Sequence, residues 1–393
     1  NETDVLIRTV TVDNHLGRPR EVTMFFCQEF QVGQSLRANT AYYDPRRDVI
    51  IHYRGNRAFL INLRDDQGSF NDYTTGVFGI HGKTGSYKDV ESGSLSKNPI
   101  EHGPCDSCIG CTRTIAAKDS HRFHYWIAAG RSIDEVFSLD QRVLKQGPEH
   151  IRESTEDFWS AWLDRRQFSF STLDEGMRSL FRRSLLIIRS HVSDNGAIIA
   201  SSDSDMLQKG KDTYSYVLPR DGAHIAAALD SVGDWNIAQR FYDFAHDVLS
   251  NDGYFMHKFN PDKSLGSSWH PWLYDDEMQL PIQEDETGIV IHELWRHYDR
   301  SRDLEFIESL YDSLIKKATS FLIGYRDDET GLPKASYDLW EEKIGVHTYT
   351  VASVYGALKS AGKLARLLGK SGDARRYDAV AGEIKKAMLD TLV

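Results

Sequence analysis

The chain has 393 residues, 40% of them hydrophobic and 11% aromatic, and its formal net charge at pH 7 is −11. This length and apolar content are enough for two domains, each with its own hydrophobic core. The negative charge disfavours nucleic acid and anionic membrane surfaces as partners, because both would repel the protein. The sequence has no apolar run of about eighteen residues, so it predicts no membrane-spanning helix.

The first residue and the cysteines bear on localisation. The chain starts with Asn rather than Met, so we expect a targeting segment and the first strands to be missing. Three of the four cysteines are crowded at Cys105, Cys108 and Cys111, unlike the even spread of a secreted disulfide framework. We therefore expect a reducing, cytoplasmic location. These thiols leave a tetrahedral metal site one ligand short, so metal binding there stays open and no metal ligand is assigned.

Residues 1–131 carry apolar side chains with a period of two, including the segments on either side of the Gly55-Asn56 turn. This alternation is typical of half-buried strands, and it predicts an N-terminal β-sandwich. The turn-forming residues Lys118-Asp119-Ser120 lie between residues 112–117 and 122–128, and we expect these two segments to pair as a hairpin.

The periodicity changes after residue 131. Ser132 with Glu135 forms a capping-box pattern, and Pro148 suits the first turn of a second helix, so 132–170 is predicted to be a helical linker. Residues 171–393 show helical periodicity with no convincing strand. The predicted helices of this third region are 174–192, 221–232, 235–250, 284–299, 303–324, 346–368 and 373–391.

Three long connections, 193–220, 251–283 and 325–345, alternate with short ones between these helices. In a ring of antiparallel helices alternate connections lie at opposite ends, so the three long ones are expected at one end. Their forked polar and aromatic side chains suit the hydroxyls and C–H faces of a sugar. These side chains, in the connections or in the first turn of the helix that follows, are Tyr214, Tyr216, Arg220, Asp221, Trp269, Trp272, Gln283, Asp285, Asp338, Trp340, Glu341 and Glu342.

Each of these motifs also has a purely structural explanation. Asp221 is a residue type that caps helices, and Trp269 and Trp272 are residue types that fill cores. Asp285 and Glu286 open a predicted helix, where acidic side chains complement the helix dipole. Their joint occurrence at one predicted end favours a carbohydrate site.

The loop 336–342 places Asp338, Glu341 and Glu342 around Trp340. Like-charge repulsion and an apolar neighbour are expected to raise the pKa of one carboxyl group above the others. A carboxyl group with a raised pKa is what a general acid at neutral pH requires.

The runs YSYVLPRDGA, SSWHPW, LPIQEDETG and SYDLWEE, in this order, resemble glycoside hydrolase family 15. That family contains glucoamylases, glucodextranases and trehalases, and the likeness covers nearly the whole chain. The resemblance implies an N-terminal β-sandwich followed by an (α/α)₆ barrel. Because a closed ring of hairpins needs more helices than the sequence shows, we expect an α+β multidomain chain with an incomplete barrel.

By the same resemblance, Glu341 corresponds to the general acid and Glu342 to a carboxylate that binds sugar hydroxyls, with Asp338 beside them. Arg220 and Asp221 correspond to the pair that grips the terminal glucose. The remaining substrate-binding positions implied by the motifs are Tyr214, Tyr216, Trp269, Gln283, Asp285 and Trp340. The catalytic base of the family lies in later helices, so we expect it outside this chain, and no metal or organic cofactor is implied.

The function expected from this resemblance is an exo-acting, inverting α-glucoside hydrolase that releases glucose from non-reducing ends of malto-oligosaccharides or glucans. A trehalase on the same scaffold is the main alternative. A phosphorylase and a non-catalytic glucan-binding protein are weaker ones. The expected partner is the sugar substrate, without nucleic acid or membrane, and the oligomeric state is left open.

Overall fold

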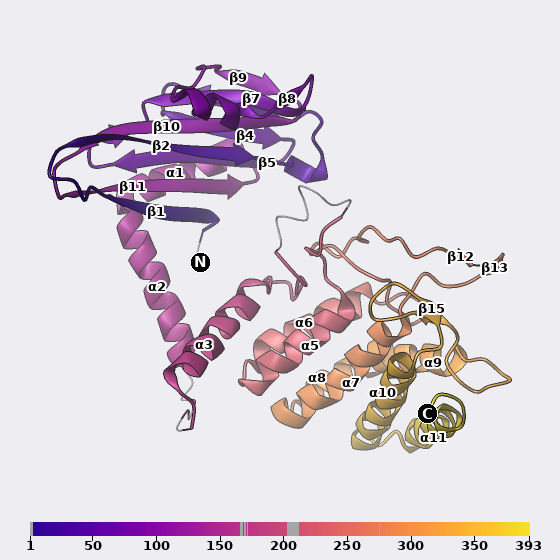
Figure 1. Ribbon diagram of the computed structural model, residues 1–393. Coiled ribbons are helices and arrows are strands. Elements are labelled where there is room, and N and C mark those ends of the chain that lie inside the picture. The colour runs from indigo at the N-terminus through magenta and orange to yellow at the C-terminus, as the bar shows by residue number, and fades with distance from the viewer. Residues whose placement is uncertain (1–2, 166–167, 169, 171, 203–211, 275) are drawn as a thin grey trace. The chain divides into compact units, whose positions relative to one another are not determined.

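The computed structural model describes residues 3–165, 168, 170, 172–202, 212–274 and 276–393. The chain divides into two compact units, Asn1–Ser169 and Phe170–Val393, and each is described by itself (Figure 1). None of the described helices has the length and hydropathy needed to cross a membrane.

The described part of the first unit contains two antiparallel sheets. One has the strand order β1-β11-β5-β4-β3-β9 with β6 beside β5, and the other has the order β2-β10-β7-β8. The strands are β1 Val5–Asp13, β2 Arg20–Glu29, β3 Thr40–Asp44, β4 Val49–Arg54, β5 Arg57–Asp65, β6 Gly68–Ser69, β7 Asp72–Ile80, β8 Lys83–Thr84, β9 Ile100–His102, β10 Cys105–Ile115 and β11 Ser120–Gly130.

The two sheets bury a shared core. Ile109 of β10 and Ile61 of β5 belong to one cluster of buried side chains, and the rings of Phe26 and Tyr125 stack with centroids 4.6 Å apart. The opposite face of the larger sheet is covered by helix α1 (Ile133–Gln146), whose Val136 is buried against it. Helix α2 (Pro148–Asp164) follows, and both helices of the segment predicted as a linker are included in the first unit.

The predicted hairpin of residues 112–117 and 122–128 is wrong. Both segments are strands, but β10 pairs with β2 and β7, whereas β11 pairs with β1 and β5. The connection between them therefore passes from one sheet to the other. Alternation of apolar residues predicts a strand and its buried face, but it does not specify the neighbouring strand.

The cysteines also differ from the prediction. Cys27 and Cys108 face each other across the β2–β10 ladder and form a disulfide, while Cys105 and Cys111 are free and buried. Cysteine spacing did not predict this pair, and the reducing, cytoplasmic location stays a prediction. The partners lie 81 residues apart, and only the strand register brings them together.

In the second unit, helices occur at all seven predicted positions. They are α3 Glu175–Ser190, α5 Pro219–Ser231, α6 Trp235–Val248, α7 Glu284–Ser301, α8 Leu304–Leu310 continuing through the π-helical turn η3 Tyr311–Ile315 into α9 Lys316–Gly324, α10 Thr348–Leu367 and α11 Ser371–Thr391. Contrary to the prediction of no strand, the long loops contain two short ladders. These pair β12 Leu273–Tyr274 with β13 Glu277–Met278, and β14 Ser336–Tyr337 with β15 Ile344–Gly345.

Consecutive helices alternate between two layers. Helices α5, α7 and α10 form one layer, in which α7 contacts both α5 and α10. Helices α6, α9 and α11 form the second layer: α6 packs on α5 and α7, α9 packs on α7 and α10, and α11 packs on α10. Figure 1 shows the loops with β12, β13 and β15 at one end of these helices. One large apolar cluster unites the two layers, from Ala223 in α5 to Ile384 in α11.

The contact between α5 and α6 depends on the absence of a side chain at Gly222. A Cβ there would lie 2.2 Å from the ring of Phe241, which is fully buried. Gly382 in α11 is also helical, but a Cβ there would meet nothing within 4 Å. We therefore expect Gly222→Ala to lower the free energy of unfolding of the helical unit by about 1–3 kcal/mol through overpacking.

The matched change Gly382→Ala is expected to raise the same free energy by up to about 1 kcal/mol, because alanine favours the helix. Urea unfolding followed by circular dichroism at a helix wavelength compares the two. Equal effects of both substitutions would contradict the packing argument.

Candidate active site

The guanidinium of Arg220 lies at the start of α5 and is almost completely buried. Its Nη1 donates to Gln283 Oε1 at 2.6 Å and to Asp285 Oδ2 at 2.7 Å. Its Nη2 lies 3.5 Å from Glu286 Oε1, and its backbone N–H donates to Glu286 Oε2 at 2.5 Å. Pro219 occupies the first helical turn, where its missing N–H costs nothing. The start of α5 is thus joined to the start of α7.

Burial dominates the electrostatics of these acids. It raises the pKa of Glu286 to about 8, although the charge of Arg220 opposes the rise. Burial also raises the pKa of Asp285, again against Arg220. Glu284 is fully buried with a strongly raised pKa, and neither of its carboxyl oxygens has a hydrogen-bond partner among the described residues. The positive charge of Arg220 therefore offsets part of the free energy that these acids need to ionise while buried.

The loop with Glu341 closes the β14–β15 ladder. Asp338 Oδ1 accepts the backbone N–H groups of Glu342 at 2.9 Å and Lys343 at 3.2 Å, which holds the loop tip. Glu341 has a φ of 62°, a left-handed backbone that is uncommon for a residue with a side chain. In this conformation the Glu341 side chain is 9% exposed, whereas Trp340 is 75% exposed.

The expected raised pKa in this loop is wrong for Glu341. Burial raises its pKa, but the hydrogen bond from His257 and the positive charge of Arg220 outweigh this and lower it. The other two carboxylates of the loop are not among the main causes of this shift: Asp338 accepts backbone N–H groups and Glu342 is exposed.

Two histidines and a glutamine connect Glu341 to Arg220. His257 Nε2 lies 3.4 Å from Glu341 Oε2. Gln283 Nε2 lies 3.2 Å from His257 Nδ1 and 3.2 Å from His270 Nε2. The ring of His270 stacks on that of His257 and contacts the ring of Tyr337, with centroids 4.2 Å and 4.1 Å apart. Residues from all three long loops therefore meet here.

The aromatic side chains border a buried lysine. Lys258 Nζ lies 4.5 Å from the ring centre of Tyr216 and 4.2 Å from that of Trp269. The same Nζ donates to Asp212 Oδ2 at 2.6 Å. Trp269 and Trp272 remain 46% and 53% exposed, so the explanation that they fill a core is wrong.

The structure thus joins Arg220, Gln283, Asp285 and Glu341 in one chain of contacts that runs through His257. Trp269 joins it by its ring contact with His257, and Tyr216 shares Lys258 with Trp269. Asp221 Oδ2 lies 4.0 Å from Arg220 Nε with its carboxylate partly exposed. Tyr214, Trp340 and Glu342 are exposed.

Sequence reasoning missed His257, Lys258, His270 and the role of Glu286. His270 lies inside the SSWHPW run and was within reach of inspection. His257 and Lys258 belong to no motif that we recognised, so nothing in the sequence distinguished them.

Metal binding by the cysteines is not supported, because Cys108 is in a disulfide and no described cysteine belongs to a group with metal-ligand geometry. The one such group among the described residues is Asp65, Asp66 and His121. Asp65 already accepts Arg113 Nε at 2.6 Å and contacts His121 Nε2 at 3.0 Å, so it serves an ion pair.

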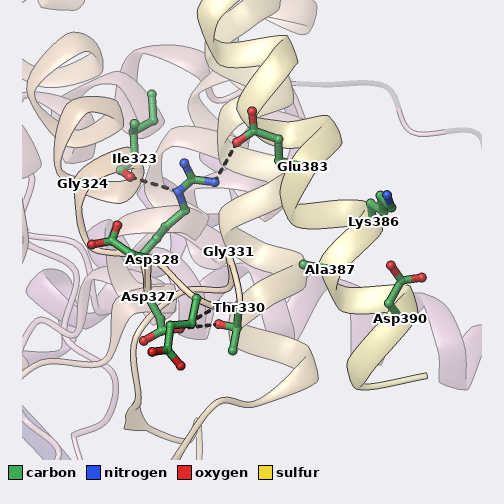
Figure 2. A pocket seen from close by; sticks show the side chains of 12 residues that line it. Ile323, Gly324, Asp327, Asp328, Thr330, Gly331, Glu383, Lys386, Ala387 and Asp390 are labelled. Atoms are coloured by element: carbon green, nitrogen blue, oxygen red, sulfur yellow. Dashed lines mark hydrogen bonds and ion pairs between the residues drawn. The ribbon is translucent and has the colours of Figure 1, made fainter.

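A separate pocket lies between the turn after α9 and helix α11, and it shares no residue with the site above (Figure 2). Arg326 Nη1 donates to Glu383 at 3.1 Å, and Asp327 Oδ1 accepts the backbone N–H of Thr330 at 2.8 Å. The first contact connects the turn to the helix and the second closes the turn, so Glu383 and Asp327 have structural roles.

Residues 178–391, more than half of the chain, match the family model described as Glycosyl hydrolases family 15. The chain belongs to this family. The matched residues all lie within the second unit and begin inside α3.

Three curated proteins are similar in sequence to different lengths of this chain. An uncharacterized glycosyl hydrolase of Methanocaldococcus jannaschii is 26% identical over 93% of this chain and 56% of its own length. A glucoamylase of Clostridium sp. is 25% identical over 71% of this chain and 36% of its own length. A trehalase of Sulfolobus acidocaldarius is 27% identical over 53% of this chain and 39% of its own length. The chain therefore spans about half the length, or less, of the curated relatives it matches.

A crystal structure of a bacterial glucoamylase complexed with acarbose is similar in fold, with a TM-score of 0.71 and 18% sequence identity. The similarity covers 93% of this chain and 50% of that one. The order of a β-rich region followed by a helical region is thus shared with that glucoamylase.

Removal of the Arg220 charge tests the buried ion cluster. Arg220→Met leaves Asp285 and Glu286 buried without their counter-charge, and we expect a loss of about 3–5 kcal/mol in the free energy of unfolding at neutral pH. Their folded-state pKa values, already raised, rise further in the variant. Above about pH 4 the unfolded chain releases these protons, which costs both proteins stability, but the extra loss in the variant grows only where wild-type Asp285 and Glu286 ionise beside Arg220, which for Glu286 is near pH 8.

Urea unfolding at pH 5 and pH 8 measures this dependence. Arg366→Met is the control, because Arg366 pairs with Asp378 at the surface, where an ion pair contributes less than about 1 kcal/mol. A loss for Arg220→Met that is the same at both pH values would contradict the cluster.

Proposed function

We propose that this family 15 protein is an exo-acting, inverting α-glucoside hydrolase that releases glucose from the non-reducing ends of malto-oligosaccharides or glucans. The observation that carries the proposal is the connection of Glu341, the acid position of the motif, to the buried Arg220 cluster through Gln283 and His257. A closed, charged cluster beside an acid suits the end of a sugar chain rather than its middle.

In this proposal Glu341 protonates the glycosidic oxygen as the bond to the leaving sugar breaks. Arg220 and Asp221 hold the terminal glucose, with Gln283 and Asp285 orienting Arg220. Tyr214, Tyr216, Trp269, Asp338, Trp340 and Glu342 complete the binding of substrate. The exposed carboxylate of Glu342 and the exposed ring of Trp340 are free to contact a sugar that arrives from solvent.

Inversion requires a second carboxylate roughly 6.5–9.5 Å from the acid, on the opposite face of the sugar. Asp285 and Glu286 are committed to Arg220 and have raised pKa values, so neither suits the role of a base. We propose that the base is supplied by sequence outside residues 1–393, and that further helices complete an (α/α)₆ barrel with those described. The 56% coverage of the Methanocaldococcus relative supports this proposal.

Replacement of the acid is the direct test. In the full-length protein, Glu341→Gln is expected to reduce kcat for maltose hydrolysis by about 10²–10⁴-fold, because the amide cannot protonate the leaving oxygen. The fold and the affinity for glucose, measured by calorimetry, are expected to persist.

Glu329→Gln is the matched control, since Glu329 lies on the turn that lines the separate pocket. It is expected to retain wild-type kcat. Near-wild-type hydrolysis by a folded Glu341→Gln variant would refute the assignment of the acid. It would also favour a non-catalytic or differently organised site.

The substrate proposed is a malto-oligosaccharide, with trehalose as the second candidate because of the Sulfolobus trehalase relative. The exposed rings of Trp269, Trp272 and Tyr274 favour the longer substrate, since they offer further glucose rings a surface for stacking. Trehalose has only two rings and gains nothing from a platform beyond them.

We therefore expect kcat/KM to be higher for maltotriose than for trehalose. Trp272→Ala is expected to lower the maltotriose value several-fold and leave the trehalose value nearly unchanged, because one aromatic contact contributes about 0.5–1.5 kcal/mol. Initial rates with both sugars measure this. A higher wild-type kcat/KM for trehalose would reverse the choice of substrate.

A further inference from the structure

The amide of Gln283 determines which ring nitrogens carry hydrogen. A guanidinium only donates hydrogen bonds, so the atom that faces Arg220 Nη1 at 2.6 Å must be the amide oxygen. The amide nitrogen then faces His257 Nδ1 and His270 Nε2, both at 3.2 Å. An amide nitrogen also only donates, so both of these ring nitrogens are acceptors.

This orientation assigns the hydrogen of His257 to Nε2. That atom lies 3.4 Å from Glu341 Oε2, and His257 is 1% exposed. Neither Nε2 nor Oε2 has a hydrogen-bond partner elsewhere among the described residues, although both are buried. A buried donor and a buried acceptor without other partners thus face each other, at the outer limit of hydrogen-bonding distance.

His270 supports this arrangement from the other side. By the same reasoning its hydrogen lies on Nδ1, and burial lowers its pKa to about 4, so the ring is neutral at neutral pH. Its ring stacks on that of His257, and the ring of Trp269 contacts His257 at an interplanar angle of 70°, so two ring contacts hold the His257 plane.

We propose that His257 is a positioning residue for Glu341. Its Nε2–H donates to Oε2, which leaves Oε1 as the oxygen that bears the transferable proton. The inference rests on the proposed function, and it adds to it how the acid is oriented and how strong it is.

The step is a hydrolysis, with water as the second reactant. The proton on Oε1 moves to the glycosidic oxygen, which keeps the electron pair of the bond that breaks, while water forms the new bond to the anomeric carbon and gives its proton to the base. Glu341 becomes a carboxylate whose Oε2 is stabilised by the His257 N–H, and a proton from water restores the acid. A donor to the carboxylate form makes the carboxyl group a stronger acid.

This arrangement has a consequence for the pH dependence. The charged or titratable groups that face Glu341 are His257 and His270 from the loop before α7 and Arg220 from α5. The His257 hydrogen bond and the charge of Arg220 lower its pKa against the effect of burial, whereas His270 is neutral at neutral pH. Protonation requires the neutral acid, so a lowered pKa moves the alkaline limb of kcat/KM to lower pH. Loss of the His257 donor moves that limb to higher pH.

The test compares His257→Phe, which removes the donor, with His257→Gln, whose amide retains one, in the full-length protein. For His257→Phe we expect the alkaline limb for maltose to rise by about one pH unit, with kcat at the plateau reduced about tenfold or more. His257→Gln is expected to restore part of both. His246→Gln is the control, because His246 lies on α6 beside Asp247, away from the site.

A readout that does not need hydrolysis separates this inference from the proposed function. Nitrogen-15 NMR of histidine-labelled protein is expected to show His257 with hydrogen on Nε2 and none on Nδ1, assigned by the signals lost in the variants. Hydrogen on Nδ1, or an alkaline limb unmoved in folded His257→Phe, overturns the inference. An inactive wild-type protein with the Nε2–H form overturns the proposed function and leaves the His257 contact standing. If His257→Phe does not fold, the NMR spectrum of the labelled wild type and the pH profile of His257→Gln test the inference instead.

Discussion

The buried charge of Arg220 is the interaction on which the second unit depends. A guanidinium removed from water has to be paired and hydrogen-bonded, and Gln283, Asp285 and Glu286 meet that need from the first turn of α7 and the residue before it. The acids in turn remain buried because one cation lies among them. The pairing therefore fixes the start of α5 against the start of α7, where the long loops converge.

Gln283 connects Arg220 to the part of the site that contains Glu341. Its oxygen is committed to Arg220, so its nitrogen has to face the two histidines, and the histidines face Glu341 and Tyr337. A substitution at Arg220 would release the amide and with it the hydrogen assignment of His257. In the proposed function, these polar contacts connect the binding of a sugar at the buried charge to the ionisation of Glu341.

The elements with the strongest periodicity were the ones predicted well. The helices of the second unit extend over several turns, so their 3.6-residue pattern was clear, and α7 and α10 differ little from the expected ranges. Strand pairing was not predictable in the same way, as the hairpin expected between β10 and β11 shows. The Cys27–Cys108 disulfide was missed for the same reason, because it follows from register between distant segments.

For the site, the sequence by itself determined the family motifs, the position of Arg220 and Glu341, and the concentration of polar and aromatic residues in three loops. Only the tertiary structure decided that Glu341 has a lowered pKa, that Glu286 has a raised one, and that His257 lies between the two halves of the site. The reason is physical. Desolvation and the interaction between charges depend on distance in space, and His257 and Glu341 are neighbours only because their loops fold onto the same end of the helices.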